Sequence, residues 1–200
     1  MTKNILIAGA TGKTGRILTQ ELVDQGHSVT ALVRDGSDTD VLPNGTHLRR
    51  ADLTNLQPGI CDGADVVIFA AGSGGSTGPE MTEKVDRQGA MRLVDLARDA
   101  GAGRFVMLSS IGADQSDPSG DLAHYLKAKH DADEHLKASG LIYAILRPVA
   151  LTDAGRSDDV ILGDDVDMSA KASRADVAHV LALAATTGEC DGQALNMQSA

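Results

Sequence analysis

Short apolar runs recur along the chain, separated by amphipathic stretches with a helical period. The runs predict strands over residues 4–8, 28–33, 46–50, 66–70, 104–108 and 142–146, with a short last strand over 194–197. The amphipathic stretches predict helices over 13–25, 81–100, 124–139 and 175–187, and Ser173 and Asp176 form a capping-box pair before the last. This alternation predicts a single-domain α/β fold, a doubly wound parallel sheet of the Rossmann type, because right-handed crossovers place helices on both faces.

Two segments do not fit this alternation of predicted strands and helices. Residues 72–78 are rich in glycine and follow the fourth predicted strand, and the acidic residues 152–167 follow the sixth. Open α/β sheets bind ligands at the carboxyl ends of their strands, so both segments are expected to act as lids. A solvated loop without a role is the alternative for the acidic stretch. Within one domain of residues 1–200, residues of about 148–174 are expected to form a small substrate-side segment.

Composition narrows the possible partners. The chain has 200 residues, 2% aromatic residues and a formal net charge of -10. The charge argues against nucleic acid or an anionic membrane, which leaves a small-molecule substrate as the expected partner. No basic, apolar and small-residue signal pattern opens the sequence, and no apolar stretch approaches the roughly 20 residues that span a bilayer. A cytoplasmic protein is therefore expected.

Cysteine and histidine spacing gives no sign of a metal site. Cys61 and Cys190 are far apart and form no CxxC pair. His124, His130 and His135 lie on or near one predicted helix, but their spacings fit no metal-binding face. We expect the three histidines to be solvated and no metal to be bound.

The first apolar run leads directly into the sequence GATGKTG and then into a helix. The first glycine permits a sharp turn, the second a close approach of pyrophosphate, and the third close packing of helix on strand. Phosphates would then bind the free N–H groups at the helix N-terminus. A P-loop would need glycine at position 7, which is Ile7. The expected cofactor-binding residues of this turn are Gly9, Thr11, Gly12, Lys13, Thr14 and Gly15.

The residue after the second strand distinguishes the two nicotinamide nucleotides. A carboxylate there would bind both ribose hydroxyls and repel a 2′-phosphate, whereas Arg34 can pair with a phosphate, so NADP(H) is expected. Asp35 would oppose this, although adjacent residues of an extended chain point to opposite sides. Asp52 and Leu53 are expected to meet the adenine, with Asp52 accepting from its exocyclic amine. A turn-forming aspartate is the alternative.

Small residues end the fourth predicted strand. Ala70, Ala71 and Gly72 would let the cofactor pass close over the sheet, or they are ordinary packing residues.

A candidate catalytic set follows the fifth strand. Ser109 and Ser110 end that strand, and Tyr125 and Lys129 share one helix face at i and i+4. A nearby ammonium and an oxidised nicotinamide favour a phenolate, so Tyr125 would exchange a proton with a substrate oxygen that serine holds. Lys129 would also bind the nicotinamide ribose. Alternatively, Tyr125 packs in an apolar stripe and Lys129 snorkels beside it.

Seven segments match the pattern of a known family: residues 9–15, 33–35, 52–53, 106–110, 125–129, 146–148 and 173–178. On these segments the whole chain resembles the atypical short-chain dehydrogenase/reductases, in their NAD(P)-binding, NmrA-like and flavin-reductase-like group. The resemblance implies a Rossmann fold that binds NADP through Arg34 and the glycine turn, with the nicotinamide near Ser109, Ser110 and Pro148. Relatives often carry glycine where this chain has Val149, and some similar reductases work without a catalytic tyrosine. A monomer or homodimer is expected.

These observations support an NADP(H)-dependent oxidoreductase that moves hydride between the nicotinamide and a small carbonyl, quinone or flavin-like acceptor. The alternative is a non-catalytic NADP(H)-binding sensor, which resembles NmrA-like regulators and needs no YxxxK motif. A third hypothesis is that the protein is an NAD(P)-dependent epimerase or dehydratase. It is less favoured because extended members of the superfamily carry a larger C-terminal domain that is not found in this sequence.

Overall fold

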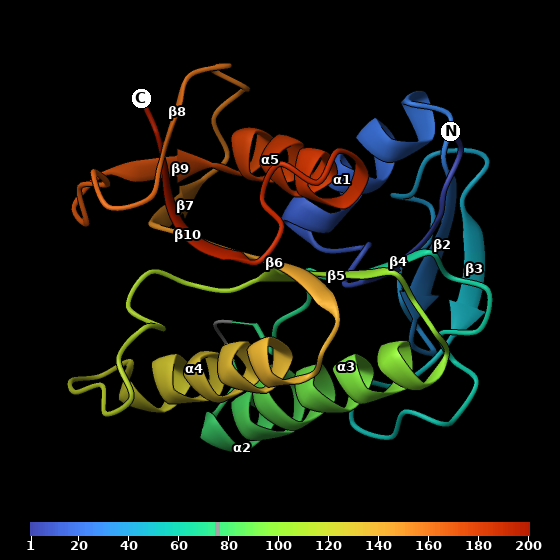
Figure 1. The fold of residues 1–200 in the computed structure, drawn as a ribbon, viewed down its shortest axis with the longest axis horizontal. Helices are drawn as coiled ribbons and strands as arrows, with labels where there is room; N and C mark the ends of the chain where they lie inside the picture. Colours follow the sequence, from blue (N-terminus) through green and yellow to red (C-terminus); the bar gives the residue numbers. More distant parts are fainter. Residues whose placement is uncertain (75–76) are drawn as a thin grey trace.

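Eight strands form the main sheet of the protein, which the computed structural model describes over residues 1–74 and 77–200 (Figure 1). Their spatial order is β3-β2-β1-β4-β5-β6-β10-β8. All neighbours are parallel except β8, which runs antiparallel to β10. The strands are β1 (Asn4–Ala8), β2 (Ser28–Val33), β3 (His47–Arg50), β4 (Val66–Phe69), β5 (Arg104–Leu108), β6 (Ile142–Pro148), β8 (Val160–Leu162) and β10 (Gln193–Ser199).

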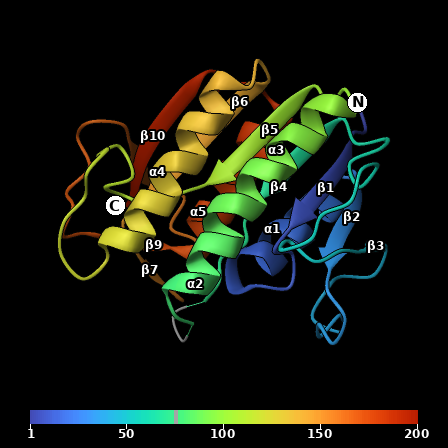
Figure 2. The ribbon, with the colours of Figure 1, turned by 90° about the horizontal axis from the view of Figure 1, so that it is seen from below.

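Helices cover both faces of this sheet, which confirms the predicted doubly wound α/β fold (Figures 1 and 2). On one face α1 (Lys13–Asp24) packs beside α5 (Arg174–Thr186), over a core that includes Ile7, Leu18 and Leu181. On the other face α3 (Ala90–Asp99) packs beside α4 (Ala123–Ala138), over a core that includes Phe69 and Leu136. The cores are aliphatic, as a sheet buried on both sides requires.

The order of the strands reverses at β1, whose neighbours are β2 on one side and β4 on the other. A crevice opens at such a point because the two crossovers leave in opposite directions, and α/β proteins bind ligands there. The glycine turn follows β1 and therefore lies at this switch point.

The helix predicted over residues 81–100 is not a single α-helix. It is built from α2 (Pro79–Met81), the π-helical segment η1 (Thr82–Gly89) and α3. A π turn holds one more residue than an α turn, so it rotates the side chains that follow, and the hydrophobic period cannot reveal it. Inside η1, the carboxylate of Asp86 is buried beneath the sheet's carboxyl edge.

The acidic segment after β6 holds more structure than the predicted loop. A separate two-stranded parallel sheet pairs β7 (Ala150–Thr152) with β9 (Lys171–Ser173), and β8 between them joins the edge of the main sheet. These strands are three residues long, too short for a clear alternation. The sequence predicted no strand within residues 152–167, so β8 corrects that prediction, and a lid role for the segment stays a prediction.

The other predicted lid, residues 72–78, includes Gly75 and Ser76, which lie outside the described residues. Within residues 1–74 and 77–200, no helix combines the length and hydropathy needed to cross a bilayer.

Candidate functional site

The three glycines of the turn differ in how much room a side chain would have. Gly9 has φ +88°, and a Cβ there would lie 2.5 Å from the Ala71 nitrogen, so the backbone leaving β4 packs directly on the turn. A Cβ on Gly15 would lie 2.0 Å from the Gly9 carbonyl oxygen, which brings the start of α1 onto the end of β1. A Cβ on Gly12 would lie 3.2 Å from the same oxygen. Gly9 and Gly15 are therefore sterically required.

The start of α1 is open to an anion. Gly12 precedes the helix and has no side chain to cap it, so its first N–H groups lack a side-chain acceptor of the usual kind. Thr14 is buried, whereas Lys13 is exposed and its Nζ lies 2.7 Å from Asp153 Oδ2. Arg174 also pairs with Asp153, at 2.6 Å. Lys13 is thus near the turn but already has a carboxylate partner.

Arg34 stands exposed directly after β2. In the described part of the chain its guanidinium has no ion-pair or hydrogen-bond partner, so it is available to a ligand phosphate. Asp35 pairs with Arg50 instead, at 2.6 Å.

Asp52 lies beyond β3, where its Oδ1 accepts from the Thr54 N–H and hydroxyl, both at 2.8 Å. These bonds to Thr54, helped by the charge of Arg34, lower the pKa of Asp52 although partial burial raises it. The structure thus shows the turn that the sequence left as an alternative. A contact from Asp52 and Leu53 to adenine stays a prediction.

Ser109 and Ser110 continue the pairing of β5 with β6, and side chains alternate along such an extended stretch, so the two serines are expected on opposite sides of the sheet. The buried Ser109 hydroxyl donates to Asp133 Oδ2 at 2.9 Å, under α4. The half-buried Ser110 hydroxyl donates to the Ile111 carbonyl at 3.3 Å. The continued pairing of β5 with β6, through Ile111 N–H and the carbonyl of the buried Pro148 at 3.0 Å, holds Ser110 beside that proline. Ser110 is the serine whose hydroxyl is not committed to a charged partner.

Lys129 is buried, with 3% of its surface exposed, so the snorkelling alternative is wrong. Its Nζ lies 3.2 Å from Asp86 Oδ1 and donates to the Leu108 carbonyl at 3.3 Å. The ammonium also lies 5.6 Å from the Phe69 ring centroid and 5.7 Å from that of Tyr125. Burial lowers the pKa of Lys129, but the anionic groups around it raise it more, and the net pKa is raised. Tyr125 and Lys129 are therefore adjacent, as predicted.

Sequence reasoning missed three buried charged residues. Asp86 joins two parts of the site, because its Oδ2 accepts from the Ser73 N–H at 2.9 Å while its Oδ1 faces Lys129. Asp133 accepts from Arg147 Nε at 2.9 Å and lies four residues after Lys129. Burial raises the pKa of Asp133 despite that guanidinium. The spacing of Tyr125, Lys129 and Asp133 at i, i+4 and i+8 was the available signal.

The histidine prediction is partly wrong. His124 is exposed, but His130 Nδ1 lies 2.9 Å from the Ala113 carbonyl and His135 Nε2 lies 2.9 Å from Asp95 Oδ1. Both rings are half-buried because α4 packs against neighbouring elements on two sides. In the described part of the chain, no group of three or more His, Cys, Asp or Glu side chains is placed to hold a metal ion.

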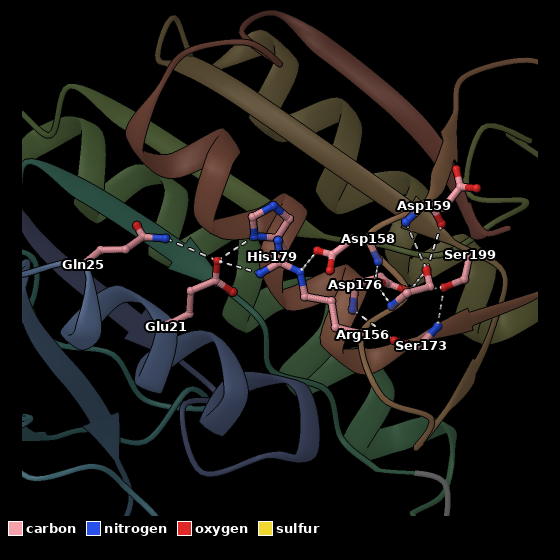
Figure 3. Close-up of polar contacts among 10 residues, drawn as sticks. Glu21, Gln25, Arg156, Asp158, Asp159, Ser173, Asp176, His179 and Ser199 are labelled. Atoms are coloured by element: carbon pink, nitrogen blue, oxygen red, sulfur yellow. Dashed lines mark hydrogen bonds and ion pairs between the residues drawn. The ribbon is translucent and has the colours of Figure 1, made fainter.

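Hydrogen bonds to the Asp176 carboxylate hold the segment that follows β7 (Figure 3). Ser173 caps α5 and accepts from the Asp176 N–H at 3.0 Å, which confirms the first half of the predicted capping box. The reciprocal bond is replaced, because the Ser173 N–H donates to the Ser199 hydroxyl at 2.9 Å. The Asp176 carboxylate accepts from the Ser157 N–H and hydroxyl, both at 2.9 Å, and from the Ser199 hydroxyl at 2.6 Å. One carboxylate thus joins α5, the acidic segment and β10.

This cluster predicts a pH dependence of stability. Burial raises the pKa of Asp176, but hydrogen bonds with Ser199, Ser157 and Ser173 together lower it by more, so the net pKa is lowered. The folded state therefore gains stability above the unfolded pKa of about 4 and loses it as the pH falls through the folded pKa. In urea unfolding from pH 7 to pH 2.5, Asp176→Asn should be less stable than wild type at pH 7, with a smaller loss below about pH 4. Parallel acid limbs would contradict this role.

A shallow hollow of about 540 Å³ lies on the outer side of α1, bordered by Val41 and Arg156. It includes none of the predicted site residues. One wall is held by Glu21, which lies 2.6 Å from His179 Nδ1 and 3.9 Å from Arg156 Nη1 (Figure 3). The candidate site is instead the open carboxyl edge of the sheet.

Comparisons with known proteins agree with this geometry. The family model described as NAD(P)H-binding matches residues 9–187. A Bacillus subtilis protein named uncharacterized sugar epimerase YhfK is 35% identical over 171 residues, which cover 82% of this chain and 79% of that protein. A structure from Bacillus halodurans, provisionally named an NAD-dependent epimerase/dehydratase, superposes with a TM-score of 0.91 at 31% identity, covering 99% of this chain and 94% of the other. The oxidoreductase ylbE from Lactococcus lactis superposes with a TM-score of 0.85 at 28% identity, covering 98% and 91%.

Proposed function

The chain belongs to the NAD(P)H-binding family, and from this premise we propose that it is an NADP(H)-dependent oxidoreductase. It transfers hydride between the nicotinamide and a small carbonyl, quinone or flavin-like acceptor, as a cytoplasmic monomer or homodimer. The observation that carries the proposal is the glycine turn at the switch point. Gly9 packs this turn against Ala71, Gly15 packs the start of α1 against Gly9, and the N-terminus of α1 has no side-chain cap.

The protein's own groups would position the nucleotide along this edge. The N–H groups after Gly12 would bind the pyrophosphate, helped by the dipole of α1. Arg34 would pair with the 2′-phosphate, because its guanidinium is exposed and unpaired in the described part of the chain. The small residues Ala70, Ala71 and Gly72 would let the nucleotide run close over β4.

The bound nucleotide would supply the hydride, and the protein would handle the proton. Tyr125 would donate a proton to the reduced oxygen of the acceptor, and Ser110 would hold that oxygen by a hydrogen bond. Lys129 lies against the ring of Tyr125 and keeps a positive charge there, since Asp86 stabilises the ammonium. Asp86 also holds Ser73, so it fixes Lys129 relative to the backbone that follows β4.

Titration with NADPH and NADH, followed by acceptors in the same cuvette, tests this function. Tighter binding of NADPH, with oxidation that depends on a quinone, a flavin or an aldehyde, is expected. Tyr125→Phe should lower kcat for aldehydes by about a hundredfold if the phenol delivers the proton. Tyr143→Phe is the matched control. Tyr143 lies near the amino end of β6, away from Pro148 at the carboxyl end, so this variant should leave kcat unchanged. Equal kcat in Tyr125→Phe and wild type would refute the proton role but leave the nucleotide site standing.

A second function, a sensor of nucleotide redox state, is favoured by one observation. Two members of the expected catalytic set are engaged by carboxylates, Ser109 by Asp133 and Lys129 by Asp86. A sensor needs the nucleotide site but no reactive hydroxyl. Binding that distinguishes NADPH from NADP⁺, with no oxidation across the acceptor panel, would establish it.

The names of two similar proteins make an epimerase worth testing in the same experiment. An epimerase oxidises its substrate and then reduces it again on the other face, so nucleotide absorbance shows no net change. Nucleotide sugars should therefore be followed by the appearance of the epimer. Epimer formation without net NADPH oxidation would replace the proposed reaction.

A further inference from the structure

An ion pair joins the ends of β2 and β3 beside the expected position of the adenosine ribose. Arg50 is in register with Val33, and the Ala51 N–H donates to the Val33 carbonyl at 3.0 Å. From this position Arg50 Nη1 lies 2.6 Å from Oδ1 of Asp35, the residue that follows Arg34. The pairing of β2 with β3 therefore brings the Arg50 guanidinium next to the Asp35 carboxylate, although the two residues are fifteen positions apart in the sequence.

Four charged side chains lie around this end of the sheet. Arg34 is exposed and has no ion-pair partner in the described part of the chain, and its charge reaches Asp52. Asp35 and Asp52 are both exposed. With Arg50 present, the two guanidiniums and the two carboxylates sum to no net charge. Without Arg50, the edge would carry one net negative charge, and a 2′-phosphate would approach against it.

The remaining arginine of β3 cannot take this role. Arg49 Nη1 donates to the Ile60 carbonyl at 2.5 Å and to the Asp62 carbonyl at 3.3 Å, so it is directed towards the loop before β4. Arg50 is the cation that meets Asp35.

We infer that Arg50 is a specificity-determining residue for the nucleotide, acting through Asp35. By pairing with Asp35, Arg50 holds that carboxylate towards β3 and neutralises it, so that Arg34 offers its charge to a 2′-phosphate without opposition. The inference rests on the proposed NADP(H) function. An unpaired Asp35 would instead accept from ribose hydroxyls and favour NADH, because a carboxylate at this edge discriminates against a 2′-phosphate.

A double-mutant cycle on the full chain tests the role. NADPH and NADH are titrated by fluorescence into wild type, Arg50→Gln, Asp35→Asn and the double variant. Arg50→Gln should weaken NADPH about threefold and change NADH less than about twofold, the size expected for one charge acting at an exposed site. Asp35→Asn in the Arg50→Gln background should restore NADPH affinity, and the differences should shrink at high salt.

Arg98→Gln is the matched control, because Arg98 is also an exposed ion-paired arginine but lies at the far end of α3. It should leave the ratio of the two affinities unchanged. An unchanged ratio in Arg50→Gln overturns the inference. So does a loss that Asp35→Asn fails to restore, because Arg50 would then contact the phosphate directly. A wild-type protein that prefers NADH refutes the proposed cofactor itself, whatever the variants show.

Discussion

Replacing Gly15 by alanine should abolish nucleotide binding and lower the free energy of unfolding by about 3 kcal/mol. The new Cβ would lie 2.0 Å from the Gly9 carbonyl oxygen and 2.9 Å from the Ala10 Cα. Both contacts are with backbone, so no side chain can rotate away. The start of α1 must instead move off β1. That movement displaces the N–H groups on which a pyrophosphate would bind.

Urea unfolding and NADPH titration measure the two effects in the same preparation. Gly155→Ala is the matched control, because Gly155 has no atom within 4 Å of its Cβ position and lacks a positive φ. It should change the free energy of unfolding by no more than about 0.5 kcal/mol. If Gly15→Ala binds NADPH like wild type, the nucleotide does not use this turn, and the proposed function fails with it.

Replacing Arg147 by methionine should cost about 3 to 5 kcal/mol of stability. Arg147 is 6% exposed and pairs with Asp133, which is fully buried. Without the guanidinium, the Ser109 hydroxyl would be the one hydrogen-bond donor left to the Asp133 carboxylate within residues 1–74 and 77–200. An uncompensated buried charge is among the most destabilising changes a core can suffer.

The same ion pair gives a pH signature and a rescue. Burial already raises the pKa of Asp133, and loss of Arg147 raises it further, so Arg147→Met should become less stable as the pH rises. Adding Asp133→Asn should recover most of the loss, because the amide removes the charge and can still accept from Ser109. Arg98→Met, at an exposed ion pair, should cost less than about 1 kcal/mol. Equal stability of the single and double variants would show that the buried charge is not the cause.

Several features followed from the sequence because they depend on local contacts. The alternation of apolar runs and amphipathic stretches predicted the order and the approximate bounds of the strands in the main sheet, apart from β8. The glycine spacing predicted a turn that only glycine can form, and Gly9 and Gly15 confirm it. Ser173 and Asp176 predicted the start of α5 because a cap involves residues three apart.

Other features were decided only by packing between distant segments. The π turns of η1 and the three-residue strands β7, β8 and β9 carry no clear period of their own, so their neighbours determine them. The partner of Lys129 could not be predicted from its own helix, because Asp86 reaches it from η1. The spacing along α4 places Asp133 on the face of Lys129, but its bond to Ser109 depends on how α4 packs on the end of β5. Burial then decided which charges are paired, since an isolated charge is costly away from water.

Periodicity, glycine sterics and helical spacing act over a few residues, so the sequence alone was enough to predict the doubly wound fold, the glycine turn after β1 and the adjacency of Tyr125 and Lys129. Tertiary structure decided which of these groups stay available to a ligand. It placed Arg50 on Asp35 and left Arg34 unpaired in the described part of the chain, and it placed Asp86 on Lys129. Such pairings depend on strand register and helix packing across the sheet, so sequence patterns that span a few residues do not predict them.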